Sequence, residues 1–312
     1  MSRSRKPDWL KMRPPSGREF TGIKQTLRER NLHTVCEEAN CPNLGECWSG
    51  RGSEGGGTAT FMLLGDTCTR SCGFCDVATG GGEPLDPDEP GNVAGAVAEI
   101  GLDYVVLTSV DRDDLPEQGA GHFAQTIREI KARHPGTLVE VLIPDFQGEQ
   151  RLIRKIIDAQ PDVIAHNVET VRRLQGYVRD PRAGYEQSLG VLEQVKRESE
   201  IHTKTSLMLG HGEYDHEVYQ ALSDLRETDV DIVTFGQYLR PSRDHLPVKD
   251  YVHPDKFETW RRVAEDDLDF LYCASGPMVR SSYKAGELFV DALLREGRTV
   301  EEARRQARLA DT

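Results

Sequence analysis

The stretch "TATFMLLGDTCTRSCGFCDV" (residues 58–77) joins an apolar run to a loop that carries three cysteines. The run 58–64 is rich in apolar and β-branched side chains, a composition that predicts a buried strand. Cys68, Cys72 and Cys75 follow it with the spacing C-x3-C-x2-C. Structural zinc needs four ligands and disulfides need pairs of thiols, so three thiols suit neither. We therefore expect the loop to bind a group that leaves one position open.

The same alternation continues along the chain. Five more apolar runs predict buried strands at 103–110, 137–144, 162–169, 201–209 and 231–237. Amphipathic stretches between them predict helices at 121–134, 148–160, 184–200 and 216–229. Parallel strands need crossover helices, so six β/α units predict one parallel sheet. Six units without a second winding predict a partial (β/α)6 barrel of the TIM type, with functional residues at the carboxyl ends of its strands.

The chain is interpreted as a barrel with two extensions. They are an N-terminal extension (1–57), the barrel (58–237) and a C-terminal extension (238–312). The C-terminal extension contains helices predicted at 254–268 and 284–297. The segment "GGGEPLDPDEPG" (80–91) predicts a loop, because glycine and proline interrupt regular structure.

Composition narrows the class of protein. The chain has 312 residues, a net charge of −13 and 37% hydrophobic residues. This acidic balance argues against binding to nucleic acid or to an anionic membrane, since both need a basic face. No run approaches the ~18 apolar residues that span a bilayer, and residues 1–20 lack the apolar stretch of a signal peptide. We expect a cytoplasmic enzyme, because clustered thiols in that compartment serve metal or redox chemistry rather than disulfides.

The first cysteine triplet favours an iron–sulfur cluster. Thiolates are the usual ligands of such clusters, and a cubane with four irons has four corners. Three cysteines would leave one iron open to a substrate. A single zinc ion is the alternative, although the loop offers neither a histidine nor a fourth cysteine.

The C-x3-C-x2-C spacing, with the aromatic Phe74 before the last cysteine, resembles the radical S-adenosylmethionine superfamily. The resemblance implies a 4Fe-4S cluster on Cys68, Cys72 and Cys75, with S-adenosylmethionine chelated to the open iron and Phe74 beside it. It also implies that one electron from the cluster cleaves the sulfonium. The resulting 5′-deoxyadenosyl radical would take hydrogen from an unactivated carbon, which acid–base chemistry cannot deprotonate.

A second triplet, Cys36, Cys41 and Cys47, lies in "CEEANCPNLGEC" (36–47) with the spacing C-x4-C-x5-C. Taken alone, this spacing also suits a zinc knuckle completed by His33. Together with the first triplet, it resembles the lipoyl synthases. The resemblance runs from about residue 18 to residue 286 and includes "YVVLTSVDRDDLPEQGAGHF" (104–123), "VDIVTFGQYLRP" (230–241) and "SGPMVRSSY" (275–283).

The resemblance implies a second, auxiliary 4Fe-4S cluster on Cys36, Cys41 and Cys47. Its fourth ligand would come from "RSSY" (280–283): Ser282, with Ser281 as the alternative. A serine oxygen is a harder and poorer ligand for iron than a thiolate, which suits a corner that must be released. On its own, this motif would predict only a helix cap.

The implied reaction inserts two sulfur atoms, at C6 and C8 of an octanoyl chain that is amide-linked to a lysine of a carrier domain. Each insertion consumes one S-adenosylmethionine, and the auxiliary cluster supplies the sulfur. The implied carriers are the acyltransferase subunit of a 2-oxoacid dehydrogenase and the glycine cleavage H protein. An electron donor such as ferredoxin and iron–sulfur cluster assembly proteins are implied as further partners.

Three alternatives differ from this function. Biotin synthase and the methylthiotransferases share the first triplet, but they do not explain the second triplet together with the serine motif. Outside enzymes, a zinc-stabilised binding protein is the alternative.

Several other residues near predicted strand ends have two interpretations. Asn167 and Glu169, in "HNVET" (166–170), are implied as contacts of S-adenosylmethionine, or they make buried structural hydrogen bonds. Ser109, Asp111 and Arg112 follow the second predicted strand, and we expect them at the same mouth of the barrel.

Four residues outside these motifs also require assignment. Arg182 and Lys204 suit either a substrate or a salt bridge. Cys273, in the apolar "FLYCASG" (270–276), is expected to be a core residue rather than a ligand. His211 replaces the leucine of the Gly-Leu-Gly-Glu that lipoyl synthases typically have, and we expect it at the surface.

Overall fold

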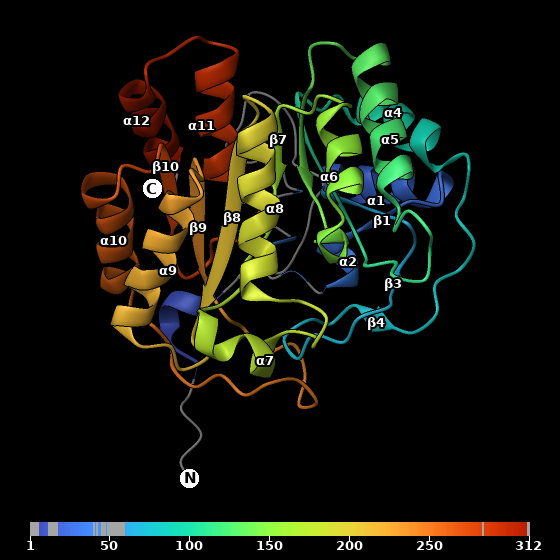
Figure 1. Cartoon of the computed structure of the whole chain (residues 1–312). Coiled ribbons are helices and arrows are strands. Elements are labelled where there is room, and N and C mark those ends of the chain that lie inside the picture. The colour runs from blue at the N-terminus through green and yellow to red at the C-terminus, as the bar shows by residue number, and fades with distance from the viewer. Residues whose placement is uncertain are drawn as a thin grey trace.

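A computed structural model gives the fold of the chain (Figure 1). The structure describes residues 6–11, 18–39, 41, 43, 44, 48, 60–282 and 284–310. Cys47 and the glycine-rich segment 51–57 therefore lie outside the described residues.

One sheet of eight strands forms the centre of the molecule, in the order β1-β2-β5-β6-β7-β8-β9-β10. Its strands are β1 (His33–Thr34), β2 (Thr60–Leu63), β5 (Tyr104–Ser109), β6 (Leu138–Leu142), β7 (Val163–Ala165), β8 (His202–Leu209), β9 (Ile232–Gln237) and β10 (Tyr272–Ser275). All neighbours from β2 to β10 pair in parallel, whereas β1 pairs antiparallel with β2. The six predicted strands and the predicted partial barrel are confirmed, and β10 adds a parallel strand from the segment assigned to the C-terminal extension.

Helices cover the outer face of this sheet (Figure 1). The main helices are α1 (Arg18–Glu29), α4 (Glu89–Ile100), α5 (Ala120–Arg133), α6 (Gln150–Ile157), α8 (Tyr185–Glu198), α9 (Asp215–Glu227), α10 (Pro254–Arg262), α11 (Lys284–Leu294) and α12 (Val300–Ala310). Shorter elements are α2 (Val35–Glu38), α7 (Gln175–Val178), and the small parallel pair β3 (Thr67–Cys68) and β4 (Ala78–Thr79). The loop predicted at 80–91 is wrong at its end, because α4 already begins at Glu89 with Pro90 in its first turn.

The interior of the barrel is closed at the amino ends of the strands. Tyr104, Leu138, Val163, Ile232 and Tyr272, each the first residue of its strand, belong to one apolar cluster with residues of α11. The rings of Tyr272 and Phe289 of α11 stack with their centroids 4.6 Å apart. In Figure 1, α11 and α12 lie at the upper end of the molecule and α7 at the lower end, where the strands finish.

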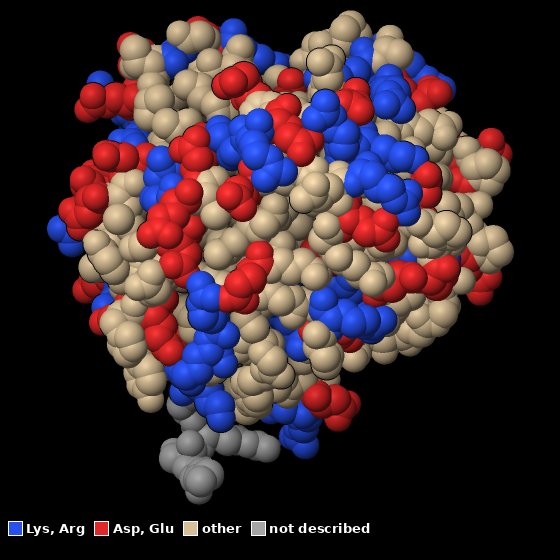
Figure 2. Space-filling model, in the orientation of Figure 1, with Lys and Arg blue, Asp and Glu red and all other residues tan. Residues whose placement is uncertain are grey.

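Ion pairs connect the outer helices. Figure 2 shows acidic and basic side chains interspersed over the face that carries α6, α8 and α9. Arg154 of α6, for example, contacts Glu198 of α8 at 2.6 Å. Among the described residues, no helix is both long and apolar enough to cross a membrane.

A buried ion pair occupies the barrel interior beyond the α11 layer. The ammonium of Lys204 on β8 lies 2.8 and 2.9 Å from the two carboxylate oxygens of Glu140 on β6. The hydroxyl of Tyr104 donates to the same carboxylate at 2.6 Å. Both charged side chains are at most 2% exposed, so Lys204 is a salt-bridge residue and does not face a substrate.

We predict that Lys204→Met destabilises the protein by about 3–5 kcal/mol, because Glu140 then remains buried without a counter-charge. The double variant Glu140→Leu/Lys204→Met should recover much of this loss, since no buried charge remains. Urea unfolding measures the free energy of unfolding of both variants. Wild-type stability in the single variant would contradict the prediction.

Candidate functional site

A cavity of about 550 Å³ opens at the carboxyl ends of the strands. It is lined by residues that end or follow β5, β6, β7, β8 and β9, and by the segment after β10. Every cysteine of the two triplets that the structure describes lines it: Cys36, Cys41, Cys68, Cys72 and Cys75. Segments far apart in the sequence therefore share one chamber.

The first triplet lies on the loop that follows β2. The thiol of Cys68 accepts a hydrogen bond from the amide of Arg70, and that of Cys72 accepts one from the amide of Asp180. Burial raises the pKa of Cys72 to about 11 and that of Cys75 to about 12. Thiols in such surroundings ionise only when a cation binds them, so metal binding here releases protons.

The separation of these sulfurs distinguishes a cluster from a single ion. His33, Glu38 and Asp66 are the one group of three among the described residues whose ligand atoms all lie within 4.8 Å of one another. The sulfurs of the first triplet do not meet this limit, so the three cannot share one zinc ion in this geometry. Ligands that each bind a different corner of a cubane must lie farther apart. The donors present therefore fit a 4Fe-4S cluster better than zinc.

Arg70, between Cys68 and Cys72 in the sequence, anchors the loop to the next two strands. Its guanidinium makes two hydrogen bonds to Asp113, at 2.8 and 2.9 Å, and two to Asp145, at 2.7 and 2.8 Å. Burial alone would raise the pKa of Asp145, but the hydrogen bonds from Arg70 outweigh burial and lower it to about 2. The ion pairs of Arg70 with Asp113 and Asp145 thus hold the cysteine loop in position.

Asp180 holds the other side of the loop. Its carboxylate accepts a hydrogen bond from the amide of Ser71 at 2.9 Å. Arg182 contacts Asp180 at 2.8 Å and Asp113 at 3.2 Å, and donates to the carbonyl of Thr69 at 2.6 Å. Arg182 therefore takes the salt-bridge role, and the substrate alternative is not needed.

Asn167 and Glu169 both line the cavity. The amide nitrogen of Asn167 donates to Glu169 at 3.1 Å, while its buried carbonyl oxygen has no partner among the described residues. Glu169 has a φ of 70°, a conformation that non-glycine residues rarely adopt and that is common at functional sites. Burial raises its pKa. The unpaired oxygen and the buried carboxyl group suit a polar ligand that carries an amino group.

The sequence expectation for the segment after β5 is partly wrong. Ser109 and Asp111 line the cavity, but Arg112 does not. Its guanidinium instead binds Asp114 at 2.8 Å and the carbonyl of Leu64 at 3.2 Å. Arg112 therefore fixes the end of β2 and faces away from the chamber.

The second triplet approaches the cavity from the N-terminal side. Cys36 lies in α2, whose first turn is capped by the hydroxyl of Thr34. The side chain of Asn43 donates to the carbonyl of Met278 at 2.7 Å, which ties this segment to the chain just before the serine motif. Ser281 and Ser282 line the same cavity as Cys41. Cys47 cannot be placed, because it lies outside the described residues.

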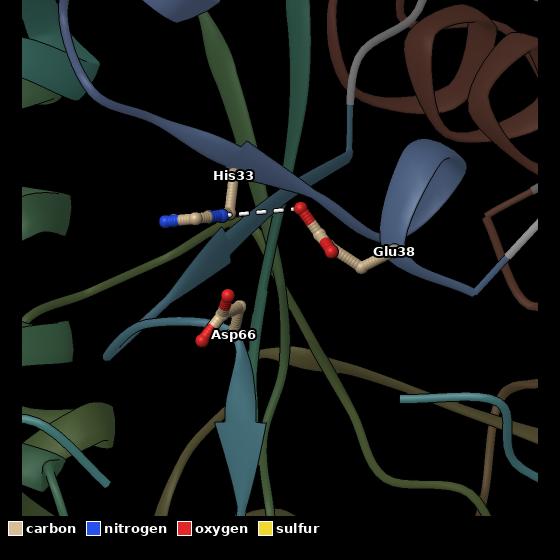
Figure 3. A group of neighbouring side chains, drawn as sticks. All are labelled: His33, Glu38 and Asp66. Carbon is tan, nitrogen blue, oxygen red and sulfur yellow. Dashed lines mark hydrogen bonds and ion pairs between the residues drawn. The ribbon is translucent and has the colours of Figure 1, made fainter. Parts of the chain in front are cut away.

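His33, the residue that would complete a zinc knuckle, lies beside carboxylates. Its Nδ1 lies 3.1 Å from Glu38, and Asp66 approaches the same pair (Figure 3). His33 is not among the residues that line the cavity. The described geometry therefore does not support a zinc knuckle completed by His33.

His211 corrects another expectation. Its side chain is buried, not at the surface, and its ring stacks on Tyr238 with centroids 4.2 Å apart. Burial lowers its pKa to about 4. A flat neutral ring can replace an apolar side chain against Tyr238, which explains why it is buried here. Cys273, by contrast, is a buried core residue on β10, as expected.

Sequence reasoning missed Arg70, Asp145 and Asp180. One indication of Arg70 was present in the sequence, since a charged arginine between two cysteines of a buried loop needs carboxylate partners. The identity of those partners depends on which strand ends meet, and no local pattern shows it.

Comparisons with known proteins show the family and the fold of the chain. Residues 62–225 match the family model of the radical SAM superfamily, and residues 1–41 match the N-terminal domain of lipoyl synthase of the radical SAM family. A solved structure of methylornithine synthase has a TM-score of 0.53 at 14% identity and covers 65% of this chain and 60% of that one. The hydrogenase maturase HydG from Carboxydothermus hydrogenoformans gives a TM-score of 0.54 at 15% identity, covering 65% and 50%. The chain belongs to the radical SAM superfamily.

Relatives that match almost the whole chain identify a family within this superfamily. A lipoyl synthase of Halobacterium salinarum is 76% identical over 310 residues, which is 99% of each chain. A mitochondrial lipoyl synthase of Danio rerio is 56% identical over 96% of this chain and 75% of its own length. The chain belongs to the lipoyl synthase family. The alternatives of a biotin synthase, a methylthiotransferase and a zinc-stabilised binding protein are thereby excluded.

We predict that Asp145→Asn lowers the free energy of unfolding by about 2 kcal/mol at neutral pH, the amount linked to a pKa of about 2 instead of 3.8. A lowered carboxyl pKa stabilises the fold above the unfolded value and ceases to do so as the pH falls through the folded value. The difference between variant and wild type should therefore shrink between pH 3.8 and about 2. Urea unfolding over a pH series tests this, and a pH-independent difference would contradict it.

Proposed function

We propose that this chain inserts two sulfur atoms, at C6 and C8, into an octanoyl group that is amide-linked to a lysine of a carrier domain. Each insertion replaces one hydrogen and consumes one S-adenosylmethionine. The observation that carries the proposal is that described cysteines of both triplets and the serine motif line one cavity. A substrate carbon bound there can reach both the group held by the first triplet and the group held by the second triplet without leaving the cavity.

Cys68, Cys72 and Cys75 are proposed to hold the first 4Fe-4S cluster. When bound and reduced, that cluster supplies the electron for reductive cleavage of S-adenosylmethionine. The side chains around it have complementary tasks. Arg70 keeps the loop in position through Asp113 and Asp145, and the buried surroundings of the thiols exclude water.

Asn167 and Glu169 are proposed to bind S-adenosylmethionine, with Phe74 at the same cavity wall. Glu169 can accept from an ammonium group, and the unpaired carbonyl oxygen of Asn167 can accept another polar hydrogen. Arg179, which also lines the cavity, can receive a carboxylate.

Cys36, Cys41 and Cys47 are proposed to hold the auxiliary cluster, with Ser282 as the fourth ligand. Arg280 lies near Cys41, and its charge favours the thiolate form of that cysteine, although burial by itself raises the pKa of Cys41. Burial lowers the pKa of Arg280, as expected for a cation that has no carboxylate partner among the described residues. An anionic group bound by Cys41 would provide that missing counter-charge.

The proposed partners follow from this reaction. The carrier is the acyltransferase subunit of a 2-oxoacid dehydrogenase or the glycine cleavage H protein. A ferredoxin-type donor supplies electrons, and assembly proteins load and restore the clusters. A cytoplasmic location is proposed with them, because these partners act where thiols remain reduced.

We predict that Cys75→Ala abolishes both S-adenosylmethionine cleavage and lipoyl formation, because the first cluster loses a ligand. Cys41→Ala should retain S-adenosylmethionine cleavage but form no lipoyl product, because only the auxiliary cluster loses a ligand. Chromatography of 5′-deoxyadenosine and mass spectrometry of an octanoylated carrier peptide measure the two activities. Lipoyl product from a folded Cys41→Ala protein that lacks the second cluster would contradict the assignment.

Ser282→Ala should likewise retain cleavage and lose lipoyl formation, since it removes the fourth ligand of the auxiliary cluster. Ser282→Cys should bind that cluster at least as firmly but release sulfur more slowly, because thiolate is the softer ligand. Ser281→Ala is the matched control. Normal turnover in Ser282→Ala with failure in Ser281→Ala would move the ligand to the neighbouring serine.

A further inference from the structure

The loop 238–252 lies outside the barrel and contacts the loop that carries Cys68, Cys72 and Cys75. Its two ends are held together by one buried side chain, Gln237, at the end of β9. The amide nitrogen of Gln237 donates to the carbonyls of Tyr238 and Asp250, and its oxygen accepts from the amide of Val252. A surface loop with its ends tied in this way is an Ω-loop, a type that is frequently functional.

The tip of this loop lies against the turn between Cys72 and Cys75. The amide of Leu246 donates to the carbonyl of Gly73 at 3.0 Å. The contact is tight, because a Cβ on Gly73 would lie only 2.9 Å from Cγ of Leu246. The hydroxyl of Tyr238, in turn, donates to the carbonyl of Leu246 at 2.8 Å, which braces the tip from within.

His245 adds a side-chain contact to the last cysteine. Its Nε2 lies 2.9 Å from the carbonyl oxygen of Cys75 and 3.5 Å from the carboxylate of Asp76. Its Nδ1 lies 2.9 Å from the hydroxyl of Ser242. The tautomer with hydrogen on Nε2 satisfies both contacts, because Nε2 then donates to Cys75 while Nδ1 accepts from Ser242.

We infer that the loop Tyr238–Val252 is a clamp on the first cysteine triplet and that His245 is its positioning residue. This inference rests on the proposed role of Cys68, Cys72 and Cys75 as cluster ligands. Arg70 and Asp180 hold the loop near its first two cysteines. His245 is the side chain that fixes the backbone of the third.

The loop 238–252 also connects the turn between Cys72 and Cys75 with the cavity wall. Arg240 and Pro241, at the start of the same loop, line the cavity. The backbone amide of Gln237, whose side chain ties the ends of the loop, donates to the carbonyl of Pro277 at 3.3 Å, close to the serine motif. One loop therefore links the surroundings of both cysteine triplets.

The test compares two amide replacements of His245 that differ in length. Glutamine places its amide nitrogen where Nε2 lies and can still donate to Cys75, whereas asparagine is too short. The matched control is His253→Asn, at an exposed histidine that caps α10, since asparagine is also a good cap. All variants are made in the full-length chain with Cys36→Ala and Cys41→Ala, so that bound iron reports the first triplet alone.

Each protein is reconstituted anaerobically with iron and sulfide. The measurements are iron per chain, the rate of iron loss to a chelator, the EPR spectrum of the reduced cluster with and without S-adenosylmethionine, and the melting temperature. His245→Asn should lose iron about fivefold faster, the factor that corresponds to one hydrogen bond, and should show an altered EPR spectrum. His245→Gln and His253→Asn should match the parent. Melting temperatures should be similar in all, since the contact is local.

The outcomes separate two failures. If His245→Asn matches its parent while Cys75→Ala loses the iron, the clamp is wrong and the cluster assignment stands. If Cys75→Ala keeps its iron, the proposed ligand role is wrong, and the clamp with it. If His245→Gln fails as badly as His245→Asn, donation from Nε2 is not what positions Cys75, which also overturns the inference.

Discussion

The pairing of Arg70 with Asp113 and Asp145 is the interaction on which the site depends. Asp113 follows β5 and Asp145 follows β6, so one guanidinium in the cysteine loop binds the ends of the next two strands. Breaking these buried ion pairs would leave uncompensated charge in the interior, which makes this geometry hard to leave. This pairing helps to fix the loop of Cys68, Cys72 and Cys75 over the cavity.

The parallel sheet provides the second constraint. Because all strands from β2 to β10 run the same way, loops from widely separated parts of the chain finish at one end of the barrel. Asn43 and Met278, 235 positions apart, are joined there by a hydrogen bond. At the opposite end, α11 and the Glu140–Lys204 pair fill the interior. The chamber is thus open on the side where the cysteines lie and closed on the other.

Much of this could be predicted from local sequence. The six strands are apolar runs, and the cysteine spacings are short-range patterns, so both were visible without the fold. β10 was missed because its apolar segment closely follows the acidic residues Glu265, Asp266, Asp267 and Asp269 and was assigned to the C-terminal extension. His211 was misplaced because its burial depends on stacking against Tyr238. Arg112 and Arg70 look alike in sequence, but one faces the end of β2 and the other supports the cysteines, a difference decided only by tertiary contacts.

We propose that one chamber brings a substrate carbon to both cysteine triplets of a single chain. The most direct measurement is mass spectrometry of an octanoyl-lysine carrier peptide after anaerobic incubation with the reconstituted full-length protein, S-adenosylmethionine and a reductant. We expect a peptide in which one hydrogen at C6 and one at C8 are each replaced by a thiol, a net gain of two sulfur atoms, with two molecules of 5′-deoxyadenosine formed for each product. A peptide that stays octanoylated while S-adenosylmethionine is cleaved would contradict it.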